Sequence, residues 1–338
     1  MVIRKSFFIC FLSVTLSMFS QEADFSLVWE NELATALRLS EGITDLKVKL
    51  LGVEQSIAGR TTNDMFTPFV PFTNGLTYCV FSGSDSLFSF TPDIGEFDSP
   101  TVDYVFPLSG ELPENLLKFY LVFSQPMEVG KVYDHLHLFQ DEEELERAFI
   151  RLSPELWDET GQQLTVWIEP GRIKRDLGPN KRLGPVLEAG KTYRLVLDEE
   201  FRSRSGKALE SKLEKRFVVA ERDEEIPKIE SVKFKIPKKH TNIPLTVFFD
   251  EPMDYATSTM VSIHLDEERI PGKWNMPRDD VLTFWPDNNW ERGYYRLEIN
   301  SDSEDLAGNN FIRLFDVDLT KSKESPELEK VSAKFEIK

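Results

Sequence analysis

The feature that most constrains the fold of this chain is an internal repeat of strand-like segments. Three short segments occur twice, in the same order along the chain. The pairs are 121–127 (LVFSQPM) with 247–253 (VFFDEPM), 164–170 (LTVWIEP) with 283–286 (TFWP), and 190–195 (GKTYRL) with 293–297 (GYYRL). Three matched segments in one order indicate a duplicated domain, because self-similarity along a chain is the mark of repeated structural units.

The repeated segments have the residue pattern of half-buried β-strands. Phe119, Leu121 and Phe123 point one way in this pattern, while Lys118 and Ser124 point the other. Successive side chains of a strand lie on opposite faces, so the alternation predicts one buried face and one face in water. The prolines fall just past the expected strand ends, where a missing N–H removes no ladder hydrogen bond. The pattern predicts an all-β chain of tandem antiparallel β-sandwich domains.

The second copy ends in a turn-rich stretch, 305–309 (DLAGN), before an expected last strand through Phe315 and Val317. Glycine and asparagine tolerate the left-handed backbone that such a reversal needs. The order F-x-x-P-M, a strand ending in proline, G-x-(x)-Y-x-L and D-L-A-G-N resembles the bacterial immunoglobulin-like domain of the S-layer protein (SbsA) type. The resemblance covers about residues 226–320 well, and 101–220 with insertions. It implies a sandwich fold and almost nothing about function, because this scaffold hosts many roles.

A further resemblance concerns the architecture of the whole chain. Segments 112–119 (LPENLLKF), 155–158 (ELWD) and 170–175 (PGRIKR) resemble uncharacterised exported proteins that carry the same paired domains. That family has no assigned activity. The resemblance therefore implies an arrangement of domains without a chemistry.

The N-terminal region contains a weaker form of the repeat. Seven residues separate Pro68 from Gly75, as they separate Pro286 from Gly293, and Tyr78 follows. No F-x-x-P-M segment precedes this pair, so we interpret the region as a degenerate β domain. The expected division is a signal peptide (1–20), a degenerate immunoglobulin-like domain (21–100), an immunoglobulin-like domain with an inserted basic loop (101–222), an SbsA-type domain (223–320) and a charged C-terminal tail (321–338) that could add one strand.

The first twenty residues have the pattern of a secretory signal peptide. Arg4 and Lys5 precede an apolar run over residues 7–19, which is too short to span a membrane comfortably. Ile9 occupies the place where lipoprotein processing needs a small residue before Cys10, so we expect no lipid anchor. The prediction is export to the periplasm, the extracellular space or the cell surface, with no transmembrane segment.

Composition narrows the range of partners. The formal net charge is −18, and loss of Arg4 and Lys5 with the signal would take it to −20. Such a charge argues against nucleic acid and against anionic membrane surfaces as partners. After export Cys79 would be the only cysteine, so no intramolecular disulfide is expected. We expect Cys79 to be a small buried hydrophobe in an apolar strand.

The first clear copy carries an insertion that the second copy lacks. Pro170 and Tyr193 are 23 residues apart, against nine between Pro286 and Tyr295, a surplus of 14. The insertion contains the candidate partner-binding residues Arg172, Lys174, Arg175, Lys181 and Arg182. Clustered arginine suits carboxylate or phosphate partners, and loops on a rigid scaffold often bind. The alternative, which we favour, is that these side chains pair with the protein's own carboxylates across a domain junction.

The sequence offers only incomplete metal sites. His135 and His137 would share one face of an expected strand, with Asp134 nearby, but no third convergent ligand is evident. The acidic run 141–146 lacks the pattern of an EF-hand and is expected to be a solvated turn or short helix. Asp305 could help to hold a cation, although capping its own turn is the commoner role. We therefore expect no metal and no other cofactor.

The sequence contains no G-x-S-x-G, P-loop or G-x-G-x-x-G motif, so we expect no enzyme. The favoured interpretation is an exported binding or scaffolding protein with an unknown protein or polysaccharide partner in the cell envelope. One alternative is a carbohydrate- or polymer-binding surface protein that uses exposed tryptophans, for which Trp274, Trp285 and Trp290 are candidates. The other is a hydrolase whose catalytic domain is the N-terminal region.

Overall fold

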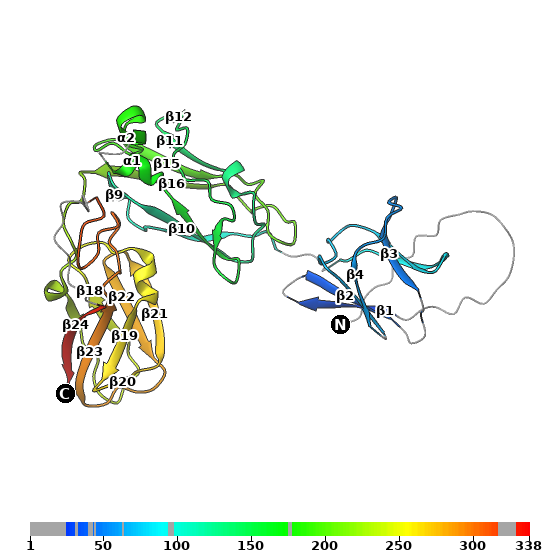
Figure 1. The fold of residues 1–338 in the computed structure, drawn as a ribbon. Helices are drawn as coiled ribbons and strands as arrows, with labels where there is room; N and C mark the ends of the chain where they lie inside the picture. The colour runs from blue at the N-terminus through cyan, green and yellow to red at the C-terminus, as the bar shows by residue number, and fades with distance from the viewer. Residues whose placement is uncertain are drawn as a thin grey trace. The chain divides into compact units, whose positions relative to one another are not determined.

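The computed structural model describes residues 25–30, 33–39, 43, 45–62, 64–93, 98–174, 178–316 and 329–338. The chain divides into two compact units, residues 1–96 and 97–338, and each is described by itself. Both units are built almost entirely from strands (Figure 1). The expected signal peptide, Cys10 and Arg175 lie outside the described residues. In the described part of the chain, no helix has the length and apolar character needed to cross a membrane.

The N-terminal unit packs two antiparallel sheets around a small apolar core. One sheet has the order β1-β2-β5-β4, with β1 (Phe25–Glu30), β2 (Leu33–Leu39), β4 (Gly59–Thr62) and β5 (Met65–Pro68). The other has the order β3-β6-β7, with β3 (Leu46–Leu50), β6 (Tyr78–Ser82) and β7 (Asp85–Phe90). Leu37 and Phe66 from the first sheet pack with Val80 and Phe90 from the second. The expected β domain is therefore present as two facing sheets.

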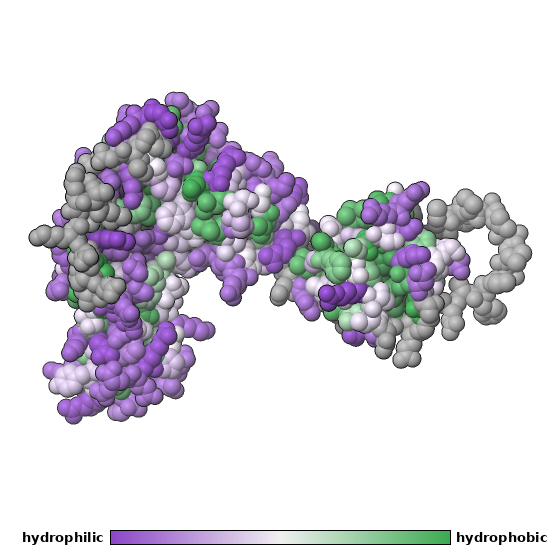
Figure 2. All heavy atoms as spheres, in the orientation of Figure 1, coloured by the Kyte–Doolittle hydropathy of each residue, from purple (hydrophilic) through white to green (hydrophobic). Residues whose placement is uncertain are grey.

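Cys79 differs from its prediction. It is half-buried rather than part of the core, because its neighbours Tyr78 and Val80 occupy the inward face of β6. Apolar side chains also reach the surface of this unit, and the exposed ones are Phe25, Leu51, Val53, Phe69, Val70, Leu76 and Leu87. Figure 2 shows apolar patches over the N-terminal unit and a mostly hydrophilic surface over the third sandwich.

The second sandwich has one four-stranded and one five-stranded sheet. The first has the order β13-β14-β10-β8, with β8 (Val102–Phe106), β10 (Lys118–Phe123), β13 (Leu156–Trp157) and β14 (Gln163–Trp167). The second has the order β12-β11-β15-β16-β9, with β9 (Glu111–Pro113), β11 (Leu136–Gln140), β12 (Glu143–Glu144), β15 (Thr192–Leu197) and β16 (Leu213–Ala220). Phe119, Leu121 and Leu195 are fully buried between them. The acidic run 141–146 turns from β11 into β12, as a solvated turn would.

The third sandwich repeats this plan with two four-stranded sheets. The first has the order β17-β18-β22-β21, with β17 (Lys233–Lys235), β18 (Leu245–Phe248), β21 (Gly272–Arg278) and β22 (Val281–Pro286). The second has the order β20-β19-β23-β24, with β19 (Val261–Leu265), β20 (Glu268–Arg269), β23 (Gly293–Asn300) and β24 (Lys330–Ile337). The core contains Val247, Leu297 and Ile337, each fully buried.

The strand orders confirm the internal repeat. β10 lies between β14 and β8 as β18 lies between β22 and β17, and β15 lies between β11 and β16 as β23 lies between β19 and β24. Phe123 and Phe249, which the sequence predicts to be equivalent core residues, are 2% and 6% exposed. The period-two alternation of apolar residues therefore predicts the buried face of these strands correctly.

A further pair of equivalent turns was not recognised in the sequence, at 203–207 (SRSGK) and 305–309 (DLAGN). The first residue of each turn donates its N–H to the carbonyl of the fifth at 2.8 Å, in Ser203 to Lys207 and in Asp305 to Asn309. Gly206 and Gly308 both have the positive φ that glycine adopts without strain, at 88° and 81°. The two turns hold the same place in the two sandwiches.

The predicted C-terminal boundary at residue 320 was wrong. β24 pairs with β23 along its whole length, from Gly293 with Ile337 to Asn300 with Lys330, so it is the counterpart of β16. The sequence allowed for one further strand in the tail but did not assign it to this sandwich, because a long connection precedes it: Lys330 lies 22 residues after Gly308, whereas β16 begins only seven residues after its own turn glycine. The strand expected through Phe315 is absent, since residues 311–316 form bends, and Val317 lies outside the described residues.

The insertion in the second sandwich forms two short helices, α1 (Pro170–Ile173) and α2 (Gly178–Leu183). Pro170 begins α1, where its missing N–H would be unpaired in any case. The Glu169 carboxylate accepts from the N–H of Gly171 at 3.1 Å, which caps the helix. The expected basic loop is thus a small helical extension.

Candidate functional site

The second and third sandwiches meet in a buried contact that we call the joint. Leu306, from the D-L-A-G-N turn of the third sandwich, belongs to the core of the second, and its carbonyl accepts from the N–H of Leu117 at 2.9 Å. In return, Phe106 and Tyr120 of the second sandwich belong to the core of the third. The rings of Phe106 and Tyr255 are stacked with centroids 4.0 Å apart. Separation of the two sandwiches would therefore expose apolar side chains of both cores.

Lys118 of β10 brings a buried charge into the joint. Its Nζ lies 2.5 Å from Oε2 of Glu304 and 3.6 Å from Oδ2 of Asp254, and its side chain is only 10% exposed. Tyr120 donates its hydroxyl to Oδ1 of Asp254 at 2.6 Å. Burial lowers the pKa of Lys118, but the carboxylates of Asp254 and Glu304 outweigh it, so the pKa lies above its ordinary value. Lys118 points away from its own core as predicted, yet the third sandwich covers that face.

Asp279, in the turn between β21 and β22, binds the backbone of the second sandwich. Its two carboxylate oxygens accept from the N–H groups of Leu108 and Ser109, at 2.7 and 2.8 Å. Lys215 of β16 donates its ammonium to the carbonyls of the same two residues, at 3.4 and 3.1 Å. Burial raises the pKa of Asp279, and the two backbone hydrogen bonds oppose this shift without cancelling it. Asp279 of the third sandwich and Lys215 of the second thus both bind the backbone of residues 108–109.

The segment that links the two sandwiches is held to both of them. Asn115 Nδ2 donates to the carbonyl of Asp223 at 2.8 Å, and the N–H of Asp223 donates to Asn115 Oδ1 at 2.9 Å. Arg222 Nη2 donates to the carbonyl of Ile173 at 3.0 Å and to Oδ2 of Asp316 at 2.8 Å. Ile173 belongs to the helical insertion and Asp316 to the connection before β24. The linker is therefore part of the joint.

Three carboxylates converge at the joint, and we call Asp223, Glu251 and Asp305 the carboxylate cluster. One oxygen from each lies within 4.8 Å of the others. Asp305 is 1% exposed, and its Oδ1 accepts from the N–H groups of Ala307 and Asn309 at 2.7 and 2.9 Å. These bonds confirm the predicted turn-capping role of Asp305. The cluster brings together the linker, the F-x-x-P-M segment and the D-L-A-G-N turn.

The surroundings of the carboxylate cluster favour protonation. Burial raises the pKa of Asp305 to about 8; bonds from Asn309 lower it, and the charges of Asp223 and Glu251 raise it. Burial, followed by the charges of Asp223 and Asp250, raises the pKa of Glu251 to about 7. Carboxylates this close repel one another, so a proton or a cation would relieve them. Carboxylate oxygens are the donors that Ca²⁺ prefers, but it takes about six to eight of them, so backbone or water oxygens would have to complete such a shell.

The basic candidate residues do not form one binding patch in the structure. Arg172 is 8% exposed and donates to the carbonyls of Gly184 at 3.0 Å and Pro185 at 2.7 Å, which holds the helical insertion to its own sandwich. Lys174 lies over the ring of Phe315 at 4.3 Å, a contact with the third sandwich. Lys181 and Arg182 are exposed on α2, and Arg175 lies outside the described residues. Arg172 therefore binds carbonyls, which neither sequence-based alternative foresaw.

The histidines are not placed as a metal site. His135 follows the 3-10 helix η1 (Val132–Asp134) and is not part of a strand, so the expected shared face was wrong for it. His137, on β11, has Nδ1 2.7 Å from Glu144 and Nε2 3.2 Å from Asp198. Burial lowers the pKa of His137, but the hydrogen bonds to these two carboxylates raise it by more, so the pKa lies above its ordinary value. His137 is thus a paired surface residue.

The tryptophans named as sugar-binding candidates differ in exposure. Trp290 is 2% exposed, and its Nε1 donates to the carbonyl of Ile243 at 2.8 Å. Trp274 packs on Phe284, with ring centroids 4.8 Å apart. Trp285 is 43% exposed and has no second exposed tryptophan beside it among the described residues. A platform of two rings for a sugar is therefore not formed by these three residues.

The sequence indicated a domain junction only at the basic insertion and missed the rest of the joint, although two residues gave a signal. Tyr120 is a large aromatic residue on the strand face that was expected to be wet, and Leu306 is an apolar residue inside a turn. Each breaks the expected pattern of polar outward positions. Such residues are informative, because exposed apolar groups in a folded protein often mark a contact.

Comparisons with known proteins give no family for this chain. No protein-family model and no curated protein matches this sequence. Similar solved structures include native alpha-2-macroglobulin from Escherichia coli, spanning domains MG0-NIE-MG1 (11% identity, 60% of this chain, 66% of that chain, TM-score 0.24). A second is the N-terminal part of the bacterial S-layer protein SbsC (12% identity, 71% of this chain, 44% of that chain, TM-score 0.26). A third is the FN1-FN3 domains of chicken CNTN1 (10% identity, 84% of this chain, 93% of that chain, TM-score 0.22). At such scores the fold assignment rests on the sheets described above.

Proposed function

We propose that this chain is an exported, non-enzymatic protein of the cell envelope that acts by contact, as a binding or scaffolding module. The observation that carries the proposal is the joint. Domains of one chain move relative to each other by default, unless their interface is large and apolar. Here each of the two cores contains side chains of the other sandwich, and Lys118 forms ion pairs there with the buried Asp254 and the half-buried Glu304. Such a joint fixes the spacing of two sandwich surfaces, which is the property a scaffold needs.

The remaining parts of the proposal rest on the sequence. Export is supported by the signal-peptide pattern of residues 1–20, and a protein or polysaccharide partner is supported by the net charge of −18, which disfavours nucleic acid. We include no cofactor in this function. Cell fractionation of the full chain tests export: the mature protein should begin near Gln21 and leave the cytoplasm. An intact chain that stays in the cytoplasm would refute this part.

The rigidity of the joint can be measured directly. Spin labels at Glu199→Cys and Glu268→Cys, two exposed positions in the second and third sandwiches, report one distance in a Cys79→Ser background. We expect a narrow distance distribution in this chain and a broad one after Lys118→Met, because Asp254 and Glu304 would be left buried without a cation. Lys212→Met, at an exposed lysine, is the matched control and should leave the distribution narrow.

One outcome would remove the basis of the scaffold proposal. If the doubly labelled chain with Lys118 in place already gives a broad distribution, the two sandwiches are not held at a fixed spacing. In that case the buried contacts would open in solution.

A further inference from the structure

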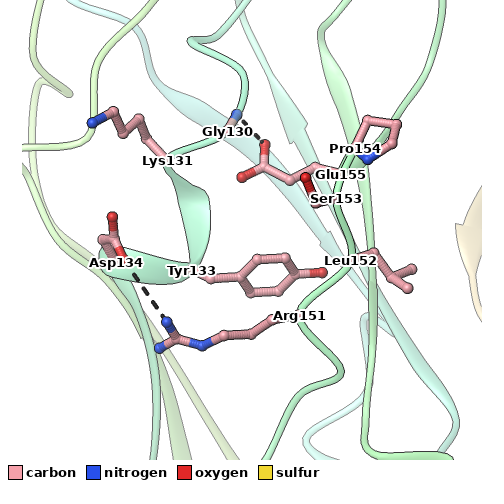
Figure 3. A pocket seen from close by; sticks show the side chains of 9 residues that line it. All are labelled: Gly130, Lys131, Tyr133, Asp134, Arg151, Leu152, Ser153, Pro154 and Glu155. Atoms are coloured by element: carbon pink, nitrogen blue, oxygen red, sulfur yellow. Dashed lines mark hydrogen bonds and ion pairs between the residues drawn. The ribbon is translucent and has the colours of Figure 1, made fainter.

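A cavity of about 200 Å³ lies in the second sandwich, and none of its lining residues takes part in the joint contacts described above. Two segments form its walls, 130–134 around the 3-10 helix η1 and 151–155 before β13. The lining residues are Gly130, Lys131, Tyr133, Asp134, Arg151, Leu152, Ser153, Pro154 and Glu155. Figure 3 shows side chains from both segments facing the same space.

One wall of the cavity is fixed by a buried carboxylate. Glu155 is 8% exposed, and its carboxylate accepts from the N–H groups of Gly130 and Val132, both at 2.9 Å. It also accepts from Nε1 of Trp157 at 2.7 Å. Three donors satisfy this carboxylate, so its role is to hold the two segments together. The cavity is therefore preorganised.

Tyr133 leaves one strong hydrogen-bonding group unused at the cavity. The residue is 8% exposed, and its Oη has no hydrogen-bond partner among the described residues. In Figure 3 its ring lies across the cavity and its hydroxyl points toward the segment of Leu152. Burial raises the pKa of Tyr133, and the nearby Leu152 backbone opposes this shift. A buried hydroxyl without a partner is unfavourable, and a ligand hydroxyl that reached it after a small shift of the 151–155 segment would gain by pairing with it.

The rim of the cavity offers both donors and acceptors. Arg151 Nη1 lies 3.8 Å from Oδ1 of Asp134, and both side chains are about two-thirds exposed, at 70% and 67%. A long, exposed ion pair of this kind is weak and can rearrange around a ligand. Lys131 and the hydroxyl-bearing Ser153 lie on the same rim. The two cations are balanced by Asp134 and Glu155, so the lining carries no net charge.

We propose that this cavity binds a single neutral pyranose ring of a glycan. Each sugar hydroxyl both donates and accepts, which matches a lining where Arg151 and Lys131 alternate with Asp134 and the Tyr133 hydroxyl. The apolar residues of the lining are Leu152 and Pro154. The volume is below the roughly 300–1,000 Å³ of sites for drug-sized ligands, so it suits one ring and not a chain of rings.

The balance of charges separates this ligand class from small anions. A site for a carboxylate or phosphate would need an excess of cations, and the lining as a whole has none. The proposal deepens the binding part of the proposed function by naming a ligand class, and it does not depend on the joint. A single ring of about a dozen heavy atoms is expected to bind with a dissociation constant on the order of 1 mM.

The test is ligand-observed NMR on the mature full chain. The probes are methyl α-glucopyranoside, methyl α-mannopyranoside, methyl α-galactopyranoside and N-acetylglucosamine, each up to about 50 mM, with lactate and inorganic phosphate as anion probes. We expect saturable binding of at least one sugar and no binding of the anions. Tyr133→Phe should weaken sugar binding about tenfold or more and leave the melting temperature unchanged or higher, because it removes an unpaired buried hydroxyl.

Two further variants keep the test decisive. Arg151→Gln alters an exposed side chain that folding does not need, and it should also weaken binding about tenfold. Tyr193→Phe is the matched control, because that hydroxyl already pairs with Gln140 and Glu188 in the same sandwich, and it should bind the sugar normally. Binding of the anions alone, binding of no probe, or binding that survives both Tyr133→Phe and Arg151→Gln would each overturn the proposal. Lys118→Met should loosen the joint without changing sugar binding, so the two proposals can fail separately.

Discussion

The second and third sandwiches place different residues at equivalent positions, and the differences concentrate where the joint forms. Ser203 and Asp305 begin the two equivalent turns, and both side chains accept from the N–H of the fifth turn residue, at 3.2 and 2.9 Å. Both residues are also almost completely buried, at 2% and 1% exposure. The turn therefore needs a buried oxygen at this position, and a serine hydroxyl is enough. The second carboxylate oxygen of Asp305 accepts from Nδ2 of Asn309 at 2.8 Å, a bond that Ser203 has no atom to make.

The F-x-x-P-M segments differ in the same way. Gln125 of the second sandwich stands where the third has Glu251, directly before the shared proline and methionine. The Gln125 side chain donates to the carbonyl of Asp98, in the segment that enters its sandwich. Glu251 instead faces Asp223, in the segment that enters the third sandwich. The comparison teaches that the fold requires polar groups at these positions, and that the third sandwich alone makes them acidic.

The largest expected effect concerns the last strand, where the two sandwiches were predicted to differ and do not. Ending the chain at residue 320 removes β24, with eight ladder pairs and the buried side chains of Phe335 and Ile337. Loss of two such side chains costs about 5–10 kcal/mol, which is comparable to the whole stability of a domain. We expect the truncated chain to lose one cooperative unfolding transition and to be cleaved by protease within residues 223–320. A truncated third sandwich that still melts cooperatively would show that β24 is dispensable.

The next effect tests whether the two cores are equivalent in energy as well as in position. Phe123→Ala and Phe249→Ala each remove a buried ring, so each should cost roughly 3–5 kcal/mol, measured by urea unfolding. The two losses should agree within about 1 kcal/mol if the surroundings are equally well packed. A loss confined to one variant would show that only one of the repeated strands is central to its core. Phe69→Ala, at an exposed ring of the N-terminal unit, is the control and should be nearly neutral.

The sequence predicted the parts of the fold that follow from local alternation, and it missed those that depend on distant segments. Phe123 and Phe249 were placed correctly because burial on one strand face repeats every two residues. The sequence allowed for a strand in the C-terminal tail, but it did not place β24 in the third sandwich, because a long connection interrupts the repeat before it. Lys118 was given the right face, but alternation cannot say whether water or another domain covers that face. The charge of Arg172 led to the prediction of a carboxylate or phosphate partner. Its side chain instead binds backbone carbonyls, which come together only in the folded insertion.

The acidic positions of the third sandwich should make its stability depend on pH, unlike those of the second. The pKa of Asp305 is about 8 in the folded chain, well above the ordinary value of an aspartate. Between about pH 4 and pH 8 the folded state therefore holds a proton that the unfolded state has lost, so stability falls as pH rises through this window and is level above it. The expected loss is on the order of 1–4 kcal/mol. Thermal unfolding of the third sandwich at pH 5 and pH 8 measures it.

Asp305→Ser gives the third sandwich the residue of the second and is the sharpest control for this effect. The serine hydroxyl should keep the turn, as Ser203 does, and the fall in stability between pH 5 and pH 8 should become clearly smaller, with Glu251 as a remaining contributor. Glu251→Gln should remove a smaller part of the effect, since the pKa of Glu251 is raised only to about 7. An unchanged pH dependence in Asp305→Ser would mean that other groups titrate in this window.

The smallest expected effect concerns the helical insertion, which the third sandwich lacks altogether. Lys174 contacts the ring of Phe315 across the joint, so Lys174→Met should cost only about 0.5–1 kcal/mol, the size of an exposed cation–π contact. Arg182→Gln, on the exposed surface of α2, should change stability by less than about 0.5 kcal/mol. Urea unfolding resolves the two if both variants are measured against the same unaltered chain.

If Arg182→Gln is the more costly change, α2 and not Lys174 carries the insertion's contribution to stability. If neither change has an effect, the insertion adds nothing to the joint through its exposed charges, and its remaining contributions are the carbonyl contacts of Arg172 and the bond from Arg222 to Ile173.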